Sequence, residues 1–467
     1  MEPFEDRDIV VVDLGFGDAG KGATVDWLCS DQADLGVAAV VRFNGGAQAA
    51  HNVTVGERHH TFSQFGSGTL SGVPTFLSRF VLVEPIALAR EARALEALGV
   101  RNPFDLIRID ARALLTTPIH VAANRAREDA RGGNRHGSCG KGIGETAAYA
   151  LEVANAPTVG DCRRPDSLRR KLSALVTFYG PLIAESRHGF PPIDDMVDMY
   201  AEFGAVVDIA DPDALGALGA GGRLVFEGAQ GVLLDEWRGF HPHTTWSTVE
   251  PSNARAMIDE LGRDSYVLGV TRTYMTRHGA GPFPTEDPEL AKVLPELHNG
   301  TGEYQGGFRT GHFDELLLHY AIEVSGGVDG LALTHLDAMD RARAAGIPIH
   351  GVHAYEGLPF VPVGEWKDLD HQQALTDSLK AVGIVPKELP ADPEDFARYL
   401  TRVQGWSDAF FAELVAGVPA EWLPHEGERQ AVVAFLTARR DLAADIVTCL
   451  SALIPDKHRA ADSDKVE

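Results

Sequence analysis

The sequence predicts an α/β fold in which a large, mostly parallel central sheet is flanked by helices and carries a P-loop-like nucleotide site. Short apolar runs of strand length alternate along the chain with longer stretches of helical periodicity. Several of these runs end in glycine-rich or polar segments, and an open parallel sheet carries its functional residues at the carboxyl ends of its strands. With 467 residues, 44% of them hydrophobic, the chain can bury a core of the size that such a sheet requires.

The elements of this fold are predicted in order along the chain. The first strand is predicted at 9–12, an Ile-Val-Val-Val run, and the second at 37–41. A helix is predicted over 84–98, where leucines and alanines recur at helical spacing before a glycine that ends it. Short apolar runs that end in polar residues predict three further strands, at 224–226, 266–270 and 331–333. This alternation of strands and helices is typical of a parallel sheet.

A glycine-rich loop at 15–22 directly follows the first predicted strand and has the P-loop spacing G-x-x-x-x-G-K. The backbone N–H groups of such a loop, and of the helix that follows it, can bind a phosphate. Gly22 stands where a P-loop carries the Ser or Thr that holds Mg²⁺, so Asp18 is the predicted substitute ligand. A plain turn is the competing interpretation. Asp18 makes it less favourable, because a carboxylate beside a phosphate is repulsive without a metal.

The segment 42–52 follows the second predicted strand and contains paired glycines, an amide and His51. Such a segment is typical of an active-site loop at the carboxyl edge of a parallel sheet. A lone histidine is more often an ordinary surface residue, but the neighbours of His51 favour a functional role.

Composition and charge restrict the class of protein. A net charge of −25 argues against general binding of nucleic acid or of an anionic membrane. No apolar run is long enough to span a bilayer, and the acidic start is not a signal peptide, so a cytoplasmic location is predicted. The four cysteines have neither metal nor disulfide spacing and are predicted to be reduced thiols.

Five motifs resemble those of the adenylosuccinate synthetase family and occur in the family's order over roughly 8–340. The family motifs are W-G-D-E-G-K-G, R-Y-Q-G-G-H-N-A-G-H-T, F-E-G-A-Q-G-x-L-L-D, T-R-V-G-A-G-P-F-P-T-E and T-K-L-D-x-x-D. The matching segments of this chain are, in the same order, 16–22, 42–52, 226–235, 276–286 and 334–340.

The resemblance implies a ligase that phosphorylates O6 of a 6-oxopurine nucleotide, such as IMP, from GTP with Mg²⁺. An amine, aspartate in the family, then displaces the phosphate. Asp18 matches both the base that removes the ring N1 proton and an Mg²⁺ ligand, the second ligand being the backbone carbonyl of Ala50. His51 matches the general acid, Lys21 a residue that neutralises phosphate charge, and Gln230 a contact to the purine and its new phosphate.

The resemblance also implies nucleotide contacts and a homodimer. Gln48 replaces an asparagine of the family, Cys139 replaces a threonine, and Asp337 matches the residue that reads guanine, which favours GTP over ATP. His335, however, replaces a family lysine. The residues implied to bind nucleotide are Gly17, Gly20, Gly22, Gln48, Ser138, Cys139, Thr245, Gly281 and Asp337.

The amine-donor segment departs from the family loop T-T-G-R-x-R-R-x-G-W. Segment 302–314 is shorter, and of the arginine cluster it keeps only Arg309, followed by Thr310. One guanidinium matches one carboxylate. Either another cation, Arg272 or Arg277, replaces the missing clamp, or the donor is not aspartate.

Two other interpretations remain open beside a plain adenylosuccinate synthetase. One is a diverged ligase of specialised nucleotide metabolism with a different amine or nucleotide substrate. The other is a nucleotide-binding regulator or pseudoenzyme, against which the intact Asp18, Lys21, His51 and Gln230 argue.

Three parts are predicted along the chain. Residues 1–345 are predicted to form the catalytic core, 346–458 a diverged C-terminal part that completes the nucleotide site, and 459–467 a disordered tail.

Overall fold

A computed structural model describes residues 6–132, 137–296 and 306–352, together with Phe4 and a few isolated positions between 407 and 437. The chain divides into two compact units, Met1–Ala354 and Tyr355–Glu467. Nearly all of the predicted part 346–458, and the whole of the predicted tail, lie outside the described residues. Their predicted roles therefore stay predictions.

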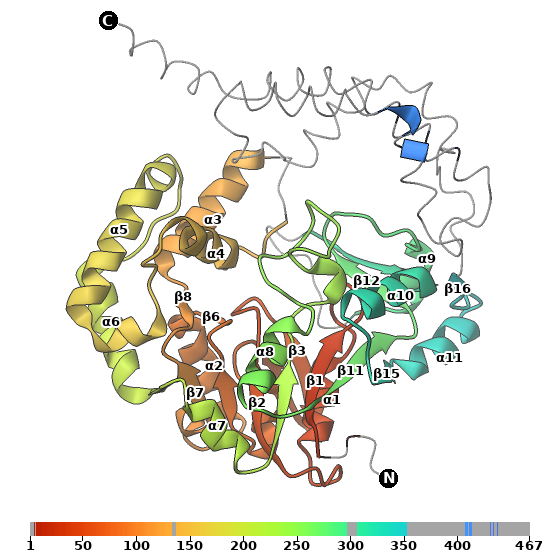
Figure 1. The fold of residues 1–467 in the computed structure, drawn as a ribbon, viewed down its shortest axis with the longest axis horizontal. Coiled ribbons are helices and arrows are strands. Elements are labelled where there is room, and N and C mark those ends of the chain that lie inside the picture. The colour runs from red at the N-terminus through yellow and green to blue at the C-terminus, as the bar shows by residue number, and fades with distance from the viewer. Residues whose placement is uncertain are drawn as a thin grey trace, which may run out of the picture. The chain divides into compact units, whose positions relative to one another are not determined.

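An eight-stranded sheet forms the centre of the first unit, and every strand pair in it is parallel. This confirms the predicted fold class (Figure 1). In sheet order, the strands are β15 (Gly330–Thr334), β11 (Ser265–Arg272), β1 (Asp8–Asp13), β10 (Arg223–Glu227), β2 (Val37–Arg42), β5 (Thr75–Leu77), β7 (Ile107–Asp110) and β9 (Asp208–Ala210).

The five strands predicted from apolar runs all form and lie side by side in this sheet. Strand β1 is buried over its whole length, because both faces of a parallel sheet are covered. Its side chains alternate between two cores, with Ile9 and Val11 in one and Val10 and Val12 in the other. Helices α1 (Lys21–Leu28), α7 (Ala214–Gly219), α8 (Ser252–Glu260) and α10 (Glu315–Val324) contribute to these two cores. Helix α11 (Leu336–Ala344) follows β15 and packs in a separate small core.

The helix predicted over 84–98 is α2 (Pro85–Ala97). It begins where the Glu84 carboxylate accepts hydrogen bonds from the N–H groups of Ile86 and Ala87. Four further helices gather on one side of the molecule, at the left and top of Figure 1. They are α3 (Pro118–Arg131), α4 (Ile143–Glu152), α5 (Pro165–Ala184) and α6 (Ile193–Val206).

Short paired strands complete the described fold. They are β3 (His51–Val55) with β4 (Arg58–Phe62), β6 (Leu82–Val83) with β8 (Leu114–Leu115), β12 (Met275–His278) with β13 (Phe308–Gly311), and β14 (Phe313–Asp314) with β16 (Gly351–Val352). The remaining helices are α9 (Pro288–Val293) and the 3₁₀ turns Ser67–Ser71, Pro103–Leu106, Val159–Arg163 and Val232–Leu234. Within the described residues, no helix combines the length and the apolar character needed to cross a membrane.

A buried histidine in the helical group makes stability depend on pH. The ring of His120 lies edge-on to Tyr149 and Tyr179, its Nδ1 accepts the Thr117 N–H at 3.1 Å, and burial lowers its pKa to about 3. An unfolded histidine titrates near pH 6.5, so between the two values the unfolded chain binds a proton that the folded chain does not. Stability contributed by this group is therefore lost as pH falls below about 6.5.

We expect a change from pH 7 to pH 5 to remove about 2 kcal/mol of unfolding free energy through His120. Urea unfolding of the wild type and of His120→Gln at both pH values measures this effect. The variant should be less stable at pH 7 and should lose about 2 kcal/mol less between the two pH values. An equal loss in both proteins contradicts the assignment.

Candidate active site

Loops that follow neighbouring strands of the sheet meet at its carboxyl edge. The loop after β1 packs on the loop after β10, where Gly231 leaves no room for a Cβ against the Gly15 carbonyl. Asn44, after β2, exchanges hydrogen bonds of 3.1 and 2.7 Å with the backbone of Ala229. Thr334, at the end of β15, donates to the Ala19 carbonyl at 2.6 Å. The motif segments at 16–22, 42–52 and 226–235 are therefore brought together, as a parallel sheet predicts.

The carboxylate of Asp13 shapes the glycine-rich loop after β1. It accepts the N–H groups of Gly15, Gly17 and Ala19 at 2.9, 3.3 and 2.8 Å and the Lys21 ammonium at 3.0 Å. The last residue of β1 thus supplies an acceptor for three of these N–H groups, and the binding of a phosphate by this loop stays a prediction. The start of α1 at Lys21 is the part of the loop that remains suited to an anion.

Three non-glycine residues at this edge have left-handed backbone conformations. Their φ angles are 61° at Asp18, 66° at Gln230 and 56° at His335. Such conformations are uncommon for non-glycine residues, and they gather at functional sites where the surrounding structure enforces them. All three positions belong to the segments that the sequence singled out.

Gly22 explains why this loop lacks the usual hydroxyl. A Cβ at this position would lie 2.9 Å from the Cβ of His51, so neither serine nor threonine fits. The same contact brings the loop that carries Asp18 against the segment that carries Ala50.

The oxygen atoms of Asp18 and Ala50 are the kind of donor that holds an Mg²⁺ ion arriving with a nucleotide. Mg²⁺ in nucleotide sites is held by one or two carboxylates together with substrate phosphates. Asp18 and the carbonyl of Ala50 are oxygen donors of that kind. Among the described residues, no group of three His, Cys, Asp or Glu side chains could hold a metal by itself.

His51 is held by Glu227, the last residue of β10. Its Nδ1 lies 2.6 Å from a Glu227 carboxylate oxygen, and Ser67 donates both its N–H, at 3.0 Å, and its hydroxyl to that carboxylate. Burial by itself would raise the pKa of Glu227. His51, Arg42 and these hydrogen bonds lower the pKa by more than burial raises it, so that its value is about 2. Burial, together with the charges of Arg42 and Lys21, lowers the pKa of His51 below its usual value, although the neighbouring Glu227 raises it. Glu227 is therefore ionised, and the His51 Nδ1–H donates to it.

Glu227 and Ser67 are site residues that sequence reasoning missed. For Glu227 a signal existed, because it is a charged residue directly after the apolar run 224–226. Ser67 gave no such signal.

Several polar atoms at this edge are buried without a hydrogen-bond partner in the described structure. They are both amide atoms of Gln48, Oε1 of Gln230 and Nε2 of His51, while Nε2 of Gln230 donates to the Thr245 hydroxyl at 2.8 Å. A buried polar group without a partner costs about 1–3 kcal/mol. Their gathering here therefore indicates a site for a ligand that forms hydrogen bonds.

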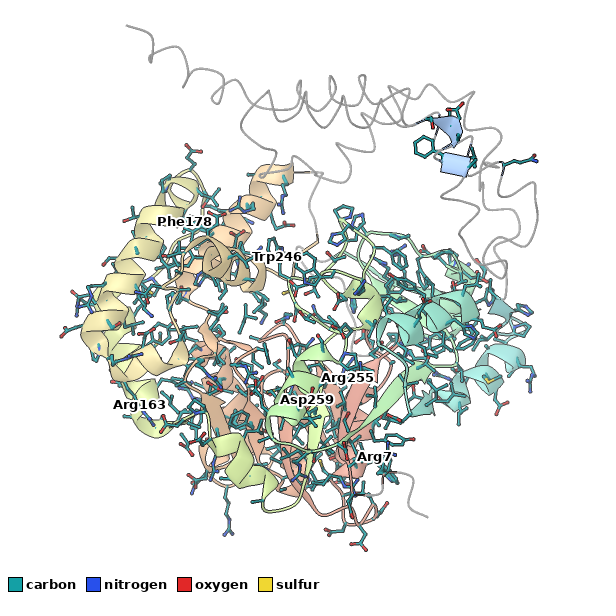
Figure 2. All side chains as sticks on the ribbon, viewed as in Figure 1. Arg7, Arg163, Phe178, Trp246, Arg255 and Asp259 are labelled. Carbon is teal, nitrogen blue, oxygen red and sulfur yellow. The ribbon has the colours of Figure 1, made fainter. Side chains whose placement is uncertain are left out.

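The loop 137–144 also reaches this region. Ser138 accepts a hydrogen bond from Asn124 at 3.0 Å, and Cys139 follows it, partly exposed. A Cβ on Gly46 would lie 2.9 Å from Ile143, at the start of α4. Trp246, labelled beside the same helix in Figure 2, follows Thr245 directly.

Gly281 and Asp337 are two further residues that the resemblance implies in nucleotide binding; the first is closely packed and the second is exposed. Gly281 packs closely against the Arg277 guanidinium and the His243 side chain, which leaves no room for a Cβ. Asp337 lies on α11 with its side chain 71% exposed, 3.3 Å from Arg341. Thr334, three residues before Asp337 in the chain, donates to the Ala19 carbonyl in the loop after β1.

The three arginines considered for binding the amine donor are already engaged. Arg309 donates to Glu286 at 2.8 Å and to a backbone carbonyl at 2.9 Å. Arg272 is paired with Glu296, and Arg277 donates to three backbone carbonyls at 3.0–3.2 Å.

The neighbouring Thr310 is buried in β13, opposite Thr276 of β12. Residues 302–305 of the predicted amine-donor segment lie outside the described residues.

Comparison with known proteins gives the family. The sequence model of the family described as adenylosuccinate synthetase matches residues 10–396. The chain belongs to the adenylosuccinate synthetase family. It is 35% identical over 346 residues to the adenylosuccinate synthetase of Neisseria gonorrhoeae, and 72% of this chain and 78% of that protein are covered. The adenylosuccinate synthetase of Ralstonia nicotianae is 32% identical over 438 residues, covering 88% of this chain and 93% of that protein. The chain is thus an enzyme, a ligase that forms a carbon–nitrogen bond.

Two solved structures share the fold. Fully ligated adenylosuccinate synthetase from Plasmodium falciparum has a TM-score of 0.61 at 22% identity, over 71% of this chain and 78% of that one. Cyanophage S-2L succinoaminodeoxyadenylate synthetase, bound to dGMP and to dATP as an energy donor, has a TM-score of 0.50 at 18% identity, over 80% of this chain and 89% of that one. At such identities the likeness concerns the fold alone.

Proposed function

We propose that this protein phosphorylates O6 of a 6-oxopurine nucleotide such as IMP, with GTP as the phosphoryl donor, and then joins an amine to C6. The observation that carries the proposal is the contact between Gly22 and His51, since it unites the Asp18 loop with a histidine held by Glu227. A base for the purine and a hydrogen-bond donor for the transferred phosphoryl group must work at one place, and these two loops supply them.

The first step is the proposed phosphoryl transfer. Asp18 takes the N1 proton, and the O6 anion attacks the γ-phosphorus, forming the O6–P bond as the bond to GDP breaks. Burial raises the pKa of Asp18, but His278, Lys21 and Arg272 together lower it below the usual value, so Asp18 begins as a carboxylate. To donate to the phosphoryl oxygens, Nε2 of His51 must take up a proton, which the negative charges of Glu227 and of the bound phosphates favour, and Gln230 faces the same site.

The second step is the displacement. The amine attacks C6, the C6–O6 bond breaks, and phosphate leaves with both electrons of that bond. The attacking nitrogen loses a proton to the departing phosphate, and Asp18 releases the N1 proton to solvent. Phosphorylation matters because the oxygen of a ring carbonyl is a poor leaving group and a phosphate ester is a good one. An Mg²⁺ ion held by Asp18 and the Ala50 carbonyl would neutralise charge on the phosphate oxygens.

The half-reaction without amine tests this proposal. The purified chain is incubated with Mg²⁺, IMP and GTP labelled with oxygen-18 in the bridge between the β- and γ-phosphates, and movement of the label is followed. We expect exchange with IMP and none with AMP, which has no 6-oxo group. Absence of exchange with every 6-oxopurine monophosphate refutes the proposed phosphoryl transfer.

We infer GTP rather than ATP as the phosphoryl donor. The Asp337 carboxylate is exposed and can accept the two N–H donors of guanine, which adenine lacks. The phage enzyme of the same fold was captured with dATP, so ATP is the second candidate. Exchange measured with each labelled triphosphate decides between the two.

We also expect a homodimer. Leu151 on α4 and Phe178 on α5 are apolar side chains that are 79% and 41% exposed, and Figure 2 labels Phe178 within the helical group. Light scattering at micromolar protein should give twice the chain mass of 50.2 kDa. A mass of one chain under these conditions contradicts the expectation.

A further inference from the structure

An aromatic pair lies beside Asp18, where β12 ends and β13 begins. His278 of β12 is opposite Phe308 of β13, and the two rings are 4.8 Å apart at an interplanar angle of 73°. Nε2 of His278 lies 3.4 Å from a carboxylate oxygen of Asp18. The imidazole thus contacts both the phenyl ring and the Asp18 carboxylate, and both rings are partly exposed.

The position of Asp18 also locates the amine donor, provided that the proposed function holds. Asp18 contacts N1 of the purine, and N1 is bonded directly to C6, the carbon that the amine attacks. A nucleophile must come within about 3–3.5 Å of the atom that it attacks. The donor therefore passes beside Asp18, where His278 and Phe308 form the nearby surface.

Three arginines of the described residues were considered as partners for a carboxylate of the donor, and each already has an ion pair or hydrogen bonds. Arg309 and Arg272 are each paired with a glutamate, Glu286 and Glu296 respectively, and Arg277 is used by backbone carbonyls. The segment 297–305, which lies outside the described residues, contains neither Lys nor Arg and adds Glu303.

To bind a second carboxylate, Arg309 or Arg272 would have to leave its glutamate partner. The freed glutamate would then repel the carboxylate of the donor. The loss of one buried charge-assisted contact lowers affinity by roughly tenfold to a hundredfold.

We propose that His278 and Phe308 form the wall of the amine-donor site, and that this wall selects an amine with at most one carboxylate, such as an amino acid with a short uncharged side chain. The imidazole and the phenyl ring fill the space beside Asp18 with groups that pack against a small neutral side chain. They offer a second carboxylate no guanidinium.

An amine panel tests the selection. Glycine, alanine, serine and aspartate are each supplied with Mg²⁺, GTP and IMP, and product mass and kcat/KM are measured. We expect at least one neutral amino acid to exceed aspartate by about tenfold or more. A preference for aspartate overturns this inference but leaves the proposed function intact if the isotope exchange occurs. Failure of the exchange overturns both.

Substitutions of Phe308 and His278 test whether this wall causes the selection of the amine donor. Phe308→Arg places a guanidinium opposite His278, and Phe308→Met is its control, similar in length and uncharged. We expect Phe308→Arg to raise kcat/KM for aspartate relative to alanine by about tenfold over Phe308→Met, mainly through a lower KM for aspartate.

His278→Val should raise KM for the neutral amine more than it lowers kcat. Isotope exchange without amine is measured for every variant. It reports how much of the protein can transfer the phosphoryl group, and the kinetic constants of each variant are corrected for that amount. The same aspartate-to-alanine ratio in wild type, Phe308→Arg and Phe308→Met refutes the role of the wall.

Discussion

Replacement of Asp18 by asparagine is expected to abolish phosphoryl transfer while the protein keeps its fold. The amide does not accept the N1 proton and is a poor Mg²⁺ ligand, so two functions are lost together. General base catalysis alone contributes about 10²–10⁴ in rate, and we expect a loss of at least about a thousandfold. The fold should persist because asparagine has the same shape and adopts the left-handed conformation found at this position, with a φ of 61°.

The measurement is isotope exchange and GDP release with IMP, together with the unfolding midpoint of each protein. Asp259→Asn is the matched control, since Asp259 is an exposed residue on α8 in the lower part of Figure 2. The control should retain wild-type rates. An Asp18→Asn enzyme within about tenfold of wild type would show that another group takes the proton.

The parallel sheet and the edge that carries the site could be predicted from sequence because both depend on local patterns. Buried strands show as apolar runs, as at 9–12 and 37–41, and their carboxyl ends must share one edge once the strands are parallel. The helix at 84–98 was equally local, since Glu84 caps it and a glycine follows it.

What the sequence could not predict depends on which side chains meet across loops. The P-loop spacing did not indicate that the Asp13 carboxylate takes three of the loop's N–H groups. His51 and Glu227 are 176 residues apart, and no local pattern joins them. Arg309 was expected to be available to a carboxylate, but the structure pairs it with Glu286, 23 residues away.

The charge on Glu227 should matter more to catalysis than the hydrogen bonds around it. Glu227→Gln is nearly the same shape but removes the negative charge that holds the His51 ring by its Nδ1–H. The amide nitrogen would also place a donor against donors, because Ser67 already points its N–H and its hydroxyl at this group. We expect the exchange rate to fall by about 10²–10⁴, with a smaller change in KM for IMP, because His51 acts on the phosphoryl group in the transition state.

A second variant separates the charge from its hydrogen bonds. Ser67→Ala removes one hydroxyl from the Glu227 carboxylate but keeps the charge, the backbone N–H at 3.0 Å and the contact to His51 at 2.6 Å. One hydrogen bond to a charged group is worth about 1.5–3 kcal/mol in stability, so this variant should unfold at lower urea. Its exchange rate should stay within about tenfold of wild type, because the ring keeps its partner. If the two variants lose equal amounts of activity, the carboxylate acts by packing, and the charge on Glu227 has no special part in phosphoryl transfer.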